Sequence, residues 1–479
     1  MNLLSIFKNK VVFYLASRYI TYGVQFITTL VIAAELGPYY MGIWGFILLL
    51  LQYFQQFHLG IANSFNVLYV HHRDNEQECN NYIANSLMLV SYLSILVICF
   101  FAFYQIFDIG TFEKYHADKY IIWVSLIAIL QYFVQFLVNL FRVKNQLNRV
   151  TFCQSIIVFL NFACIFFFRG EELIKWLVAG YVIGNLLCVV LALTSGSIPS
   201  IKKIKLSTIY QKEILKKGLY LFLYNSCFYF IIISIRTIIS GHYKVEEFGM
   251  FTFSFSLAHA ILLLLEALSF VIFPKVIGKL SSDDRNEVVR TLDILRGTYI
   301  TAAHLLIYIA LICFPFLLYF FPKYDGALTA LNLIALTILM NSNSYGYTEL
   351  LISCNKEKLS ACISLVALGL NCVIALFLVY VIHCEFSYVI IATMITYLFF
   401  SLAATWFALK QIHQPITLKG YFPMRLMIPY LSAVAISVLQ IYIIIWLPLL
   451  FAVAMNWGKI ISVVSLSKTL LKSPEKVNL

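Results

Sequence analysis

The feature that most constrains this chain is a series of about fourteen apolar stretches, each long enough to cross a lipid bilayer. About 20 apolar residues span the hydrocarbon core of a membrane. Of the 479 residues, 62% are hydrophobic and only 12% are charged, so little sequence is left for a separate soluble domain. We therefore predict an all-α integral membrane protein. The predicted spans are 11–34, 41–67, 82–107, 120–141, 150–168, 172–194, 218–240, 248–273, 297–321, 327–351, 359–382, 387–409, 426–446 and 447–466.

The positive residues between these stretches alternate in density from one connection to the next. Short loops rich in Lys and Arg stay in the cytoplasm. With the N-terminus inside, 25 of the 34 Lys and Arg residues fall in cytoplasmic segments and 6 in external ones, where Lys175 at the outer end of its span is counted as external. Arg18, Arg236 and Lys459 lie within spans and are set aside. This division predicts a multi-pass membrane protein with an even number of spans and both termini in the cytoplasm. The net charge of +12 then reflects orientation and contact with anionic lipid headgroups, which favours the bilayer over nucleic acid as the partner.

The sequence offers no motif for a cofactor, a metal or a catalytic centre. Eight of the eleven cysteines fall in apolar stretches, where cysteine packs as a small hydrophobic residue, and no C-x-x-C pair occurs. Gly278–Lys279 lacks the glycine five residues earlier that a Walker loop requires. The external connections are short, whereas a membrane enzyme that joins sugars usually needs an extramembrane surface for donor and acceptor. These features disfavour an enzyme, and we expect no cofactor and a first span that is retained rather than cleaved.

The two halves of the chain carry a faint repeat. A short external turn after the first span leads to Gly42-Ile43-Trp44, and a similar turn after the seventh leads to Gly249-Met250-Phe251, 207 residues later. Parallel repeats, related by an axis along the membrane normal, have such a spacing, although a chance match explains it equally well. We predict a six-helix lobe at 1–195, a basic cytoplasmic linker at 196–217, a second six-helix lobe at 218–410, and two additional helices with a basic tail at 411–479.

The motif around the first turn resembles a known family. Residues 35–44 and 59–60 resemble the Leu-Gly-Pro, Gly-Ile-Trp and Leu-Gly signature of bacterial oligosaccharide flippases of the polysaccharide-biosynthesis type, and 236–251 resembles their second-half motif. These flippases belong to the multidrug/oligosaccharidyl-lipid/polysaccharide exporter superfamily. The motif turns are formed by Gly37, Pro38, Gly42 and Gly249. The chain departs from the family at Ile235, where an aspartate often precedes the arginine of the seventh span.

The resemblance implies a substrate and a mechanism. The substrate would be a polyprenyl-pyrophosphate-linked oligosaccharide, moved between leaflets for O-antigen, capsule or exopolysaccharide assembly, with the polysaccharide polymerase and chain-length machinery as partners. The resemblance also implies a basic central cavity. Arg18 and Arg236 are the candidate pyrophosphate-binding residues, because arginine offers a bidentate fork that stays charged. The alternative for both is that the long side chain reaches the membrane interface.

Other embedded polar residues are candidates for coupling or for lining a cavity. His259 and Glu266 are seven residues apart on nearly the same helix face, and together they could couple proton movement to transport. His58 and His304 are candidate cavity residues, with a buried interhelical hydrogen bond as the alternative for each histidine. Asn341, Asn343 and Glu349 belong to an unusually polar run that could line a sugar path, allow a helix to unwind, or form a packing seam.

These observations favour a two-lobed flippase that works by alternating access and has no catalytic residue. A cation-coupled multidrug exporter on the same scaffold is the main alternative. It predicts a cluster of acidic residues within the membrane, whereas the charged residues within the spans here are mainly basic. An integral membrane glycosyltransferase or polymerase is disfavoured by the short external loops.

Overall fold

The computed structural model describes residues 10–107, 110–199, 204–280, 282, 284–415 and 424–472. Within these ranges it describes all side chains except those of 10–13, 15, 107, 110–112, 117, 220–221, 262–278, 424 and 462–472. Contacts divide the chain into two compact units. Unit 1 comprises Met1–Ser226 and Lys244–Gly249, and unit 2 comprises Cys227–Tyr243 and Met250–Leu479.

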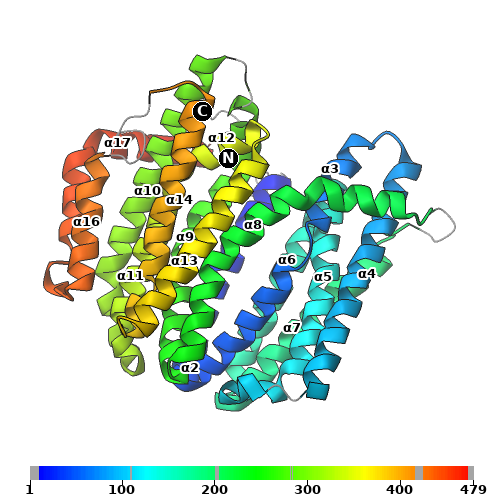
Figure 1. Cartoon of the computed structure of the whole chain (residues 1–479), viewed down its shortest axis with the longest axis horizontal. Helices are drawn as coiled ribbons and strands as arrows, with labels where there is room; N and C mark the ends of the chain where they lie inside the picture. The colour runs from blue at the N-terminus through cyan, green and yellow to red at the C-terminus, as the bar shows by residue number, and fades with distance from the viewer. Residues whose placement is uncertain are drawn as a thin grey trace. The chain divides into compact units, whose positions relative to one another are not determined.

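Unit 1 is a helical bundle (Figure 1). Its elements are α2 (Lys10–Gln56), α3 (Ile61–His71), α4 (Glu76–Phe107), the 3-10 helices η1 (Gly110–Tyr115) and η2 (Ala117–Lys119), α5 (Ile121–Val143), α6 (Leu147–Phe167), α7 (Gly170–Thr194), and the first part of α8 (Thr208–His242). The core lies where α3, α4 and α5 meet, around Phe65, Ile83 and Phe136. α2 continues through a kink at Gly37, whose φ of 66° is left-handed, and Pro38 follows directly. This kink separates the first two predicted spans.

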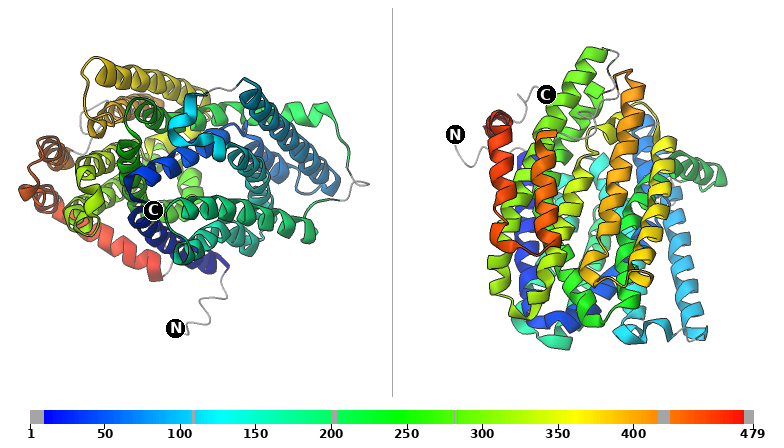
Figure 2. Two further views of the ribbon diagram at one scale, coloured as in Figure 1. Left: turned by 90° about the horizontal axis from the view of Figure 1, so that it is seen from below. Right: turned by 60° about the vertical axis from the view of Figure 1, so that its left-hand side comes forward.

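Unit 2 is built around one helix, α11 (Leu328–Ser342), that is buried along most of its length. Its elements are the second part of α8, most of α9 (Val245–Leu280), α10 (Arg285–Tyr319), η4 (Pro322–Ala327), α11 (Leu328–Ser342), α12 (Tyr347–Ser353), α13 (Glu357–Tyr380), η5 (Phe386–Tyr388), α14 (Ile391–Gln411), α16 (Met424–Val438), η6 (Tyr442–Ile444) and α17 (Leu447–Lys472). Every side chain of α11 from Thr329 to Met340 is buried, as expected for a helix that is apolar on all sides. α10, α14 and α16 contact α11, and α17 packs on α10 and α16 (Figure 2, right).

The predicted all-helical membrane fold is confirmed. No strand occurs in the part of the chain that the structure describes, and every predicted span coincides with a helix, a helix segment or a pair of helices. Eleven described segments are long and apolar enough to cross a membrane, and the first of them, Ala16–His71, contains the predicted span 41–67 and most of 11–34. Outward-facing apolar side chains such as Ile98, Phe166 and Val373 are more than half exposed, which suits contact with lipid. The count of fourteen spans is compatible with this architecture and stays a prediction.

The two longest predicted cytoplasmic connections are more helical than their sequences indicate. α8 begins at Thr208, ten residues before the predicted span, and α10 begins at Arg285, where the Asp284 carboxylate accepts a hydrogen bond from the Asn286 backbone N–H at 2.9 Å. Hydropathy identifies only the apolar part of a helix, so polar turns at its cytoplasmic end are missed.

The start of α8 is anchored to α4 by polar side chains. Asn81 Oδ1 accepts from the Lys205 backbone N–H at 2.8 Å, and Asn85 Oδ1 accepts from the Ser207 N–H at 3.0 Å. One turn further, the Tyr210 hydroxyl donates to Glu78 at 3.0 Å. Burial, together with nearby carboxylates, raises the pKa of Tyr210. The described end of the predicted linker is therefore held against unit 1.

Candidate functional site

Arg18 lies on α2, half-buried, and its neighbours are tyrosines. Its guanidinium donates a hydrogen bond to the Tyr22 hydroxyl at 2.6 Å and lies 4.5 Å from the centre of the Tyr22 ring. Tyr14, one turn earlier, donates to Gln154 of α6 at 3.3 Å. Residues four apart share a helix face, so Tyr14, Arg18 and Tyr22 form one stripe. A phenol hydroxyl is not a counter-ion, so the bond to Tyr22 does not form an ion pair with the guanidinium.

Arg236 lies on the part of α8 that belongs to unit 2, and only 2% of its surface is exposed. Its guanidinium lies 5.2 Å from the centre of the Phe255 ring on α9. The His259 ring packs against the same phenylalanine with a centroid distance of 4.7 Å and the two ring planes tilted by 32°, and His259 itself is accessible. Two of the predicted residues, Arg236 and His259, are thus brought together around Phe255. The side chain of Glu266 lies outside the described residues, so its pairing with His259 stays a prediction.

His58 occupies a break in the predicted second span. α2 ends at Gln56 and α3 begins at Ile61, with positive φ angles at Leu59 and Gly60. The Nδ1 of His58 accepts a hydrogen bond from the Gly60 N–H at 2.9 Å, and its ring packs edge-on against Phe222. The imidazole therefore stabilises this turn, a local role that the apolar pattern of 41–67 does not reveal.

His304 is fully buried in unit 2. Its Nδ1 is 2.8 Å from the Tyr308 hydroxyl, and its ring also lies near Tyr430 of α16. The Tyr430 hydroxyl donates to the Leu336 carbonyl at 3.2 Å, which links the same cluster to α11. His304 thus sits where α10, α11 and α16 pack together.

The polar run around Asn341, Asn343 and Glu349 is a helix break. α11 ends at Ser342 and α12 begins at Tyr347, and Gly346 between them has a φ of 89°. The Glu349 carboxylate accepts from the Gly346 N–H and from the Thr348 hydroxyl, while Asn341 is half-buried. Of the predicted alternatives, the helix interruption is the one observed; a sugar path along this run stays a prediction.

Arg296 stabilises this break. From its position just before the span 297–321, the sequence predicts only that it contributes to the positive charge of a cytoplasmic loop. The buried guanidinium donates to the Asn343 carbonyl at 2.7 Å and to the Tyr345 carbonyl at 2.9 Å, and it lies 3.8 Å from the centre of the Tyr347 ring. The polar composition of 341–349 is typical of a break between helices, where backbone carbonyls lack donors within the helix. No spacing rule connects that run to an arginine some fifty residues earlier.

The motif turns of the two halves pack directly on each other within unit 1. A Cβ placed on Gly42 would lie 2.2 Å from the Val245 carbonyl oxygen. A Cβ on Gly249 would lie 1.8 Å from the Pro38 carbonyl oxygen and 2.8 Å from the Gly42 nitrogen. The buried ring of Tyr115 packs between residues next to these turns, stacked on Phe46 at 4.3 Å and edge-on to Phe248. These glycines are needed because backbone approaches backbone.

Comparisons with known proteins agree with this architecture. The model of a family described as polysaccharide biosynthesis protein matches residues 7–280. No curated protein sequence matches the chain significantly. The structure is similar to the lipid II flippase MurJ in an inward closed conformation, with 15% identity, a TM-score of 0.67, and coverage of 94% of this chain and 100% of that one.

Two further solved structures share the fold. An inward-facing multidrug resistance MATE family transporter of the MOP superfamily has 11% identity and a TM-score of 0.66, covering 82% of this chain and 94% of that one. A MOP superfamily transporter from Pyrococcus furiosus has 14% identity and a TM-score of 0.53, covering 84% and 95%. These neighbours are described as transporters or as a flippase, and at these identities the likeness shows a shared fold. The chain belongs to the polysaccharide biosynthesis protein family, and its fold is that of MOP-superfamily transporters.

Proposed function

We propose that this protein moves a polyprenyl-pyrophosphate-linked oligosaccharide from the cytoplasmic to the periplasmic leaflet of the bacterial inner membrane, for assembly of a surface polysaccharide. Membership in the polysaccharide biosynthesis family carries this proposal, because the family model covers more than half of the chain. The fold shared with a lipid II flippase supports it, since that protein also handles a lipid-linked substrate.

The two embedded arginines are the proposed contacts for the pyrophosphate. Arg18 is half-buried and bonded to a neutral phenol, and Arg236 is buried against Phe255. A guanidinium can bind two phosphate oxygens in parallel and stays charged at every physiological pH. The pyrophosphate pairs with these arginines during its passage, while the polyprenyl tail remains in lipid. Alternating access needs no covalent step from the protein.

The division of the chain into two six-helix lobes, a linker at 196–217 and two additional helices after 410 is part of this proposal. Both termini lie in the cytoplasm, and a polysaccharide polymerase with its chain-length partner receives the translocated unit. A cation-coupled multidrug exporter is the second candidate, favoured by the structural similarity to a MATE family transporter.

Deletion of the gene tests the proposal. We expect loss of surface polysaccharide and accumulation of its lipid-linked precursor on the cytoplasmic side, with both restored by the wild-type gene. Unchanged polysaccharide, together with increased sensitivity to cationic drugs, would instead support the exporter. Reconstituted protein gives a direct check, in which a fluorescent polyprenyl-pyrophosphate oligosaccharide should become accessible on the far side of proteoliposomes.

A further inference from the structure

A cavity of about 530 Å³ lies between the outer ends of α5 and α7 in unit 1, lined by Lys119, Tyr120, Trp123, Lys175, Val178 and Ala179. None of these residues belongs to the proposed pyrophosphate site. Lys119, Tyr120 and Trp123 come from η2 and the start of α5, and the other three come from α7. The predicted orientation places this cavity at the periplasmic surface of the membrane.

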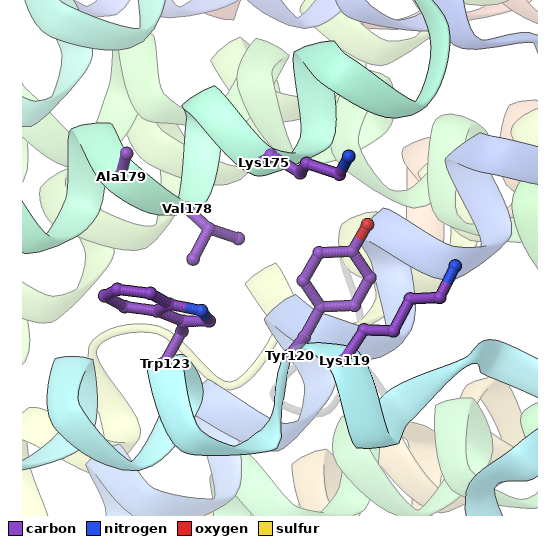
Figure 3. A pocket seen from close by; sticks show the side chains of 6 residues that line it. All are labelled: Lys119, Tyr120, Trp123, Lys175, Val178 and Ala179. Carbon is purple, nitrogen blue, oxygen red and sulfur yellow. The ribbon is translucent and has the colours of Figure 1, made fainter.

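The cavity has one polar end and one apolar end. Figure 3 shows the ammonium groups of Lys119 and Lys175 on one side with the Tyr120 hydroxyl between them, and the indole of Trp123, Val178 and Ala179 on the other. The apolar wall continues along both helices, because Leu126 and Ile183, one turn beyond Trp123 and Ala179, are exposed on the same faces. A tryptophan at this depth suits the boundary between headgroups and acyl chains. The shape and polarity fit an amphipathic ligand.

Both lysines at the polar end already have carboxylate partners. Lys119 pairs with Glu171 at 3.2 Å and Lys175 pairs with Glu172 at 2.6 Å. All four side chains are at least 40% exposed, so each pair is screened by solvent and exchanges readily with another ion. The rim thus carries two positive and two negative charges. A headgroup that contains one phosphate and one ammonium satisfies both signs, whereas an anionic headgroup adds a negative charge beside two glutamates.

We propose that this cavity binds one phospholipid of the outer leaflet whose headgroup carries a phosphate and a primary ammonium, as in phosphatidylethanolamine. The phosphate lies between Lys119 and Lys175 and accepts a hydrogen bond from the Tyr120 hydroxyl. The primary ammonium donates to Glu171 or Glu172, and one acyl chain follows Trp123 and Ala179 along the seam of α5 and α7. A choline headgroup lacks the N–H donors that the glutamates require. This lipid is distinct from the transported substrate, so the inference rests on the predicted orientation of the chain but not on what the protein transports.

Native mass spectrometry of the purified full-length protein tests this site. The protein is delipidated and then mixed with dioleoyl phosphatidylethanolamine, phosphatidylcholine and phosphatidylglycerol in equal amounts. We expect one phosphatidylethanolamine molecule to remain bound at a collisional activation energy that removes the other two lipids. Ala179→Phe fills the cavity and should reduce this retention at least fivefold, as should the double variant Lys119→Ala/Lys175→Ala, which leaves the cavity open.

Two control variants separate the site from general effects. Ala163→Phe makes the same change on the exposed face of α6, and Lys323→Ala removes an external lysine from unit 2; both should retain the lipid as the wild type does. Thermal unfolding checks that each variant is folded. As a second readout, phosphatidylethanolamine with brominated chains should quench tryptophan fluorescence less in Trp123→Phe than in the wild type. Equal retention by Ala179→Phe and the wild type, or equal retention of the three lipids by the wild type, overturns the proposal.

Discussion

Gly42 and Gly249 occupy equivalent positions in a reciprocal contact between the two halves of the sequence. Gly42 meets the carbonyl of Val245, and Gly249 meets the carbonyl of Pro38. Adding the repeat spacing of 207 residues to Pro38 and Gly42 gives Val245 and Gly249. Each half therefore contributes the same two positions to the contact, as in an isologous interface about a two-fold axis. This reciprocity favours the internal repeat over a chance match of glycines.

We expect Gly42→Ala and Gly249→Ala each to destabilise the protein markedly. The added methyl would collide with backbone carbonyls rather than with a flexible side chain, and overpacking of this kind costs about 1–3 kcal/mol or more. Thermal unfolding in detergent should show lowered midpoints. Gly23→Ala and Gly241→Ala are matched controls, because a Cβ at either glycine meets no other atom within 4 Å. Unfolding midpoints that match the wild type for the two contact variants would contradict the close approach.

Arg18→Ala should abolish export, and Arg18→Lys should retain part of it. A pyrophosphate contact needs the positive charge more than the planar fork. Tyr22→Phe is the control, since it removes the hydroxyl bonded to Arg18 but leaves the charge and the ring in place. Surface polysaccharide is measured at equal protein levels. Wild-type polysaccharide in the alanine variant would remove Arg18 from the site.

Arg296→Lys should lower the stability of unit 2. One planar guanidinium bridges the carbonyls of Asn343 and Tyr345, and a lysine cannot reproduce both bonds together with the stacking on Tyr347. Each buried carbonyl left without a donor costs about 1–3 kcal/mol. Arg290→Lys, an exposed position on the same helix, is the matched control. If both lysine variants unfold at the same temperature as the wild type, the guanidinium does not hold the break between α11 and α12.

The sequence predicts the helices well and the interruptions poorly. Apolar length locates a helix because the bilayer sets that length, and every predicted span coincides with helical residues. The break at His58 depends on two residues with positive φ, Leu59 and Gly60, and the break at Asn343 on one, Gly346. Both also depend on distant partners, Phe222 and Arg296 respectively. Tertiary packing determines which residues meet, and it produces no periodic pattern in the sequence. The same reason explains why the proximity of Arg236 and His259 through Phe255 could not be anticipated.

Reporter fusions should place Lys205 and Lys323 on opposite sides of the membrane. Positive charge is concentrated in alternate connections, so Lys205 is expected in the cytoplasm and Lys323 in the periplasm. A phosphatase reporter, active only outside, and a fluorescent reporter, active only inside, give complementary signals at each position. Periplasmic activity at both positions would show that the predicted topology is wrong.

Glu266→Gln should lower transport and flatten its dependence on pH. His259 is accessible and lies against Phe255, which also contacts Arg236, so a change in the charge of this histidine would act next to a proposed substrate contact. The predicted pairing with Glu266 rests on the spacing of seven residues, which places two side chains on nearly the same face of a helix, where protons arriving from one side of the membrane can reach both. The substitution is nearly isosteric, so folding should be kept.

Glu246→Gln, at an exposed position in the first turn of the same helix, is the control and should transport like the wild type at every pH. Rates are measured in proteoliposomes between pH 5.5 and 8. A Glu266→Gln variant with the wild-type rate and pH profile would leave the pair with a structural role only.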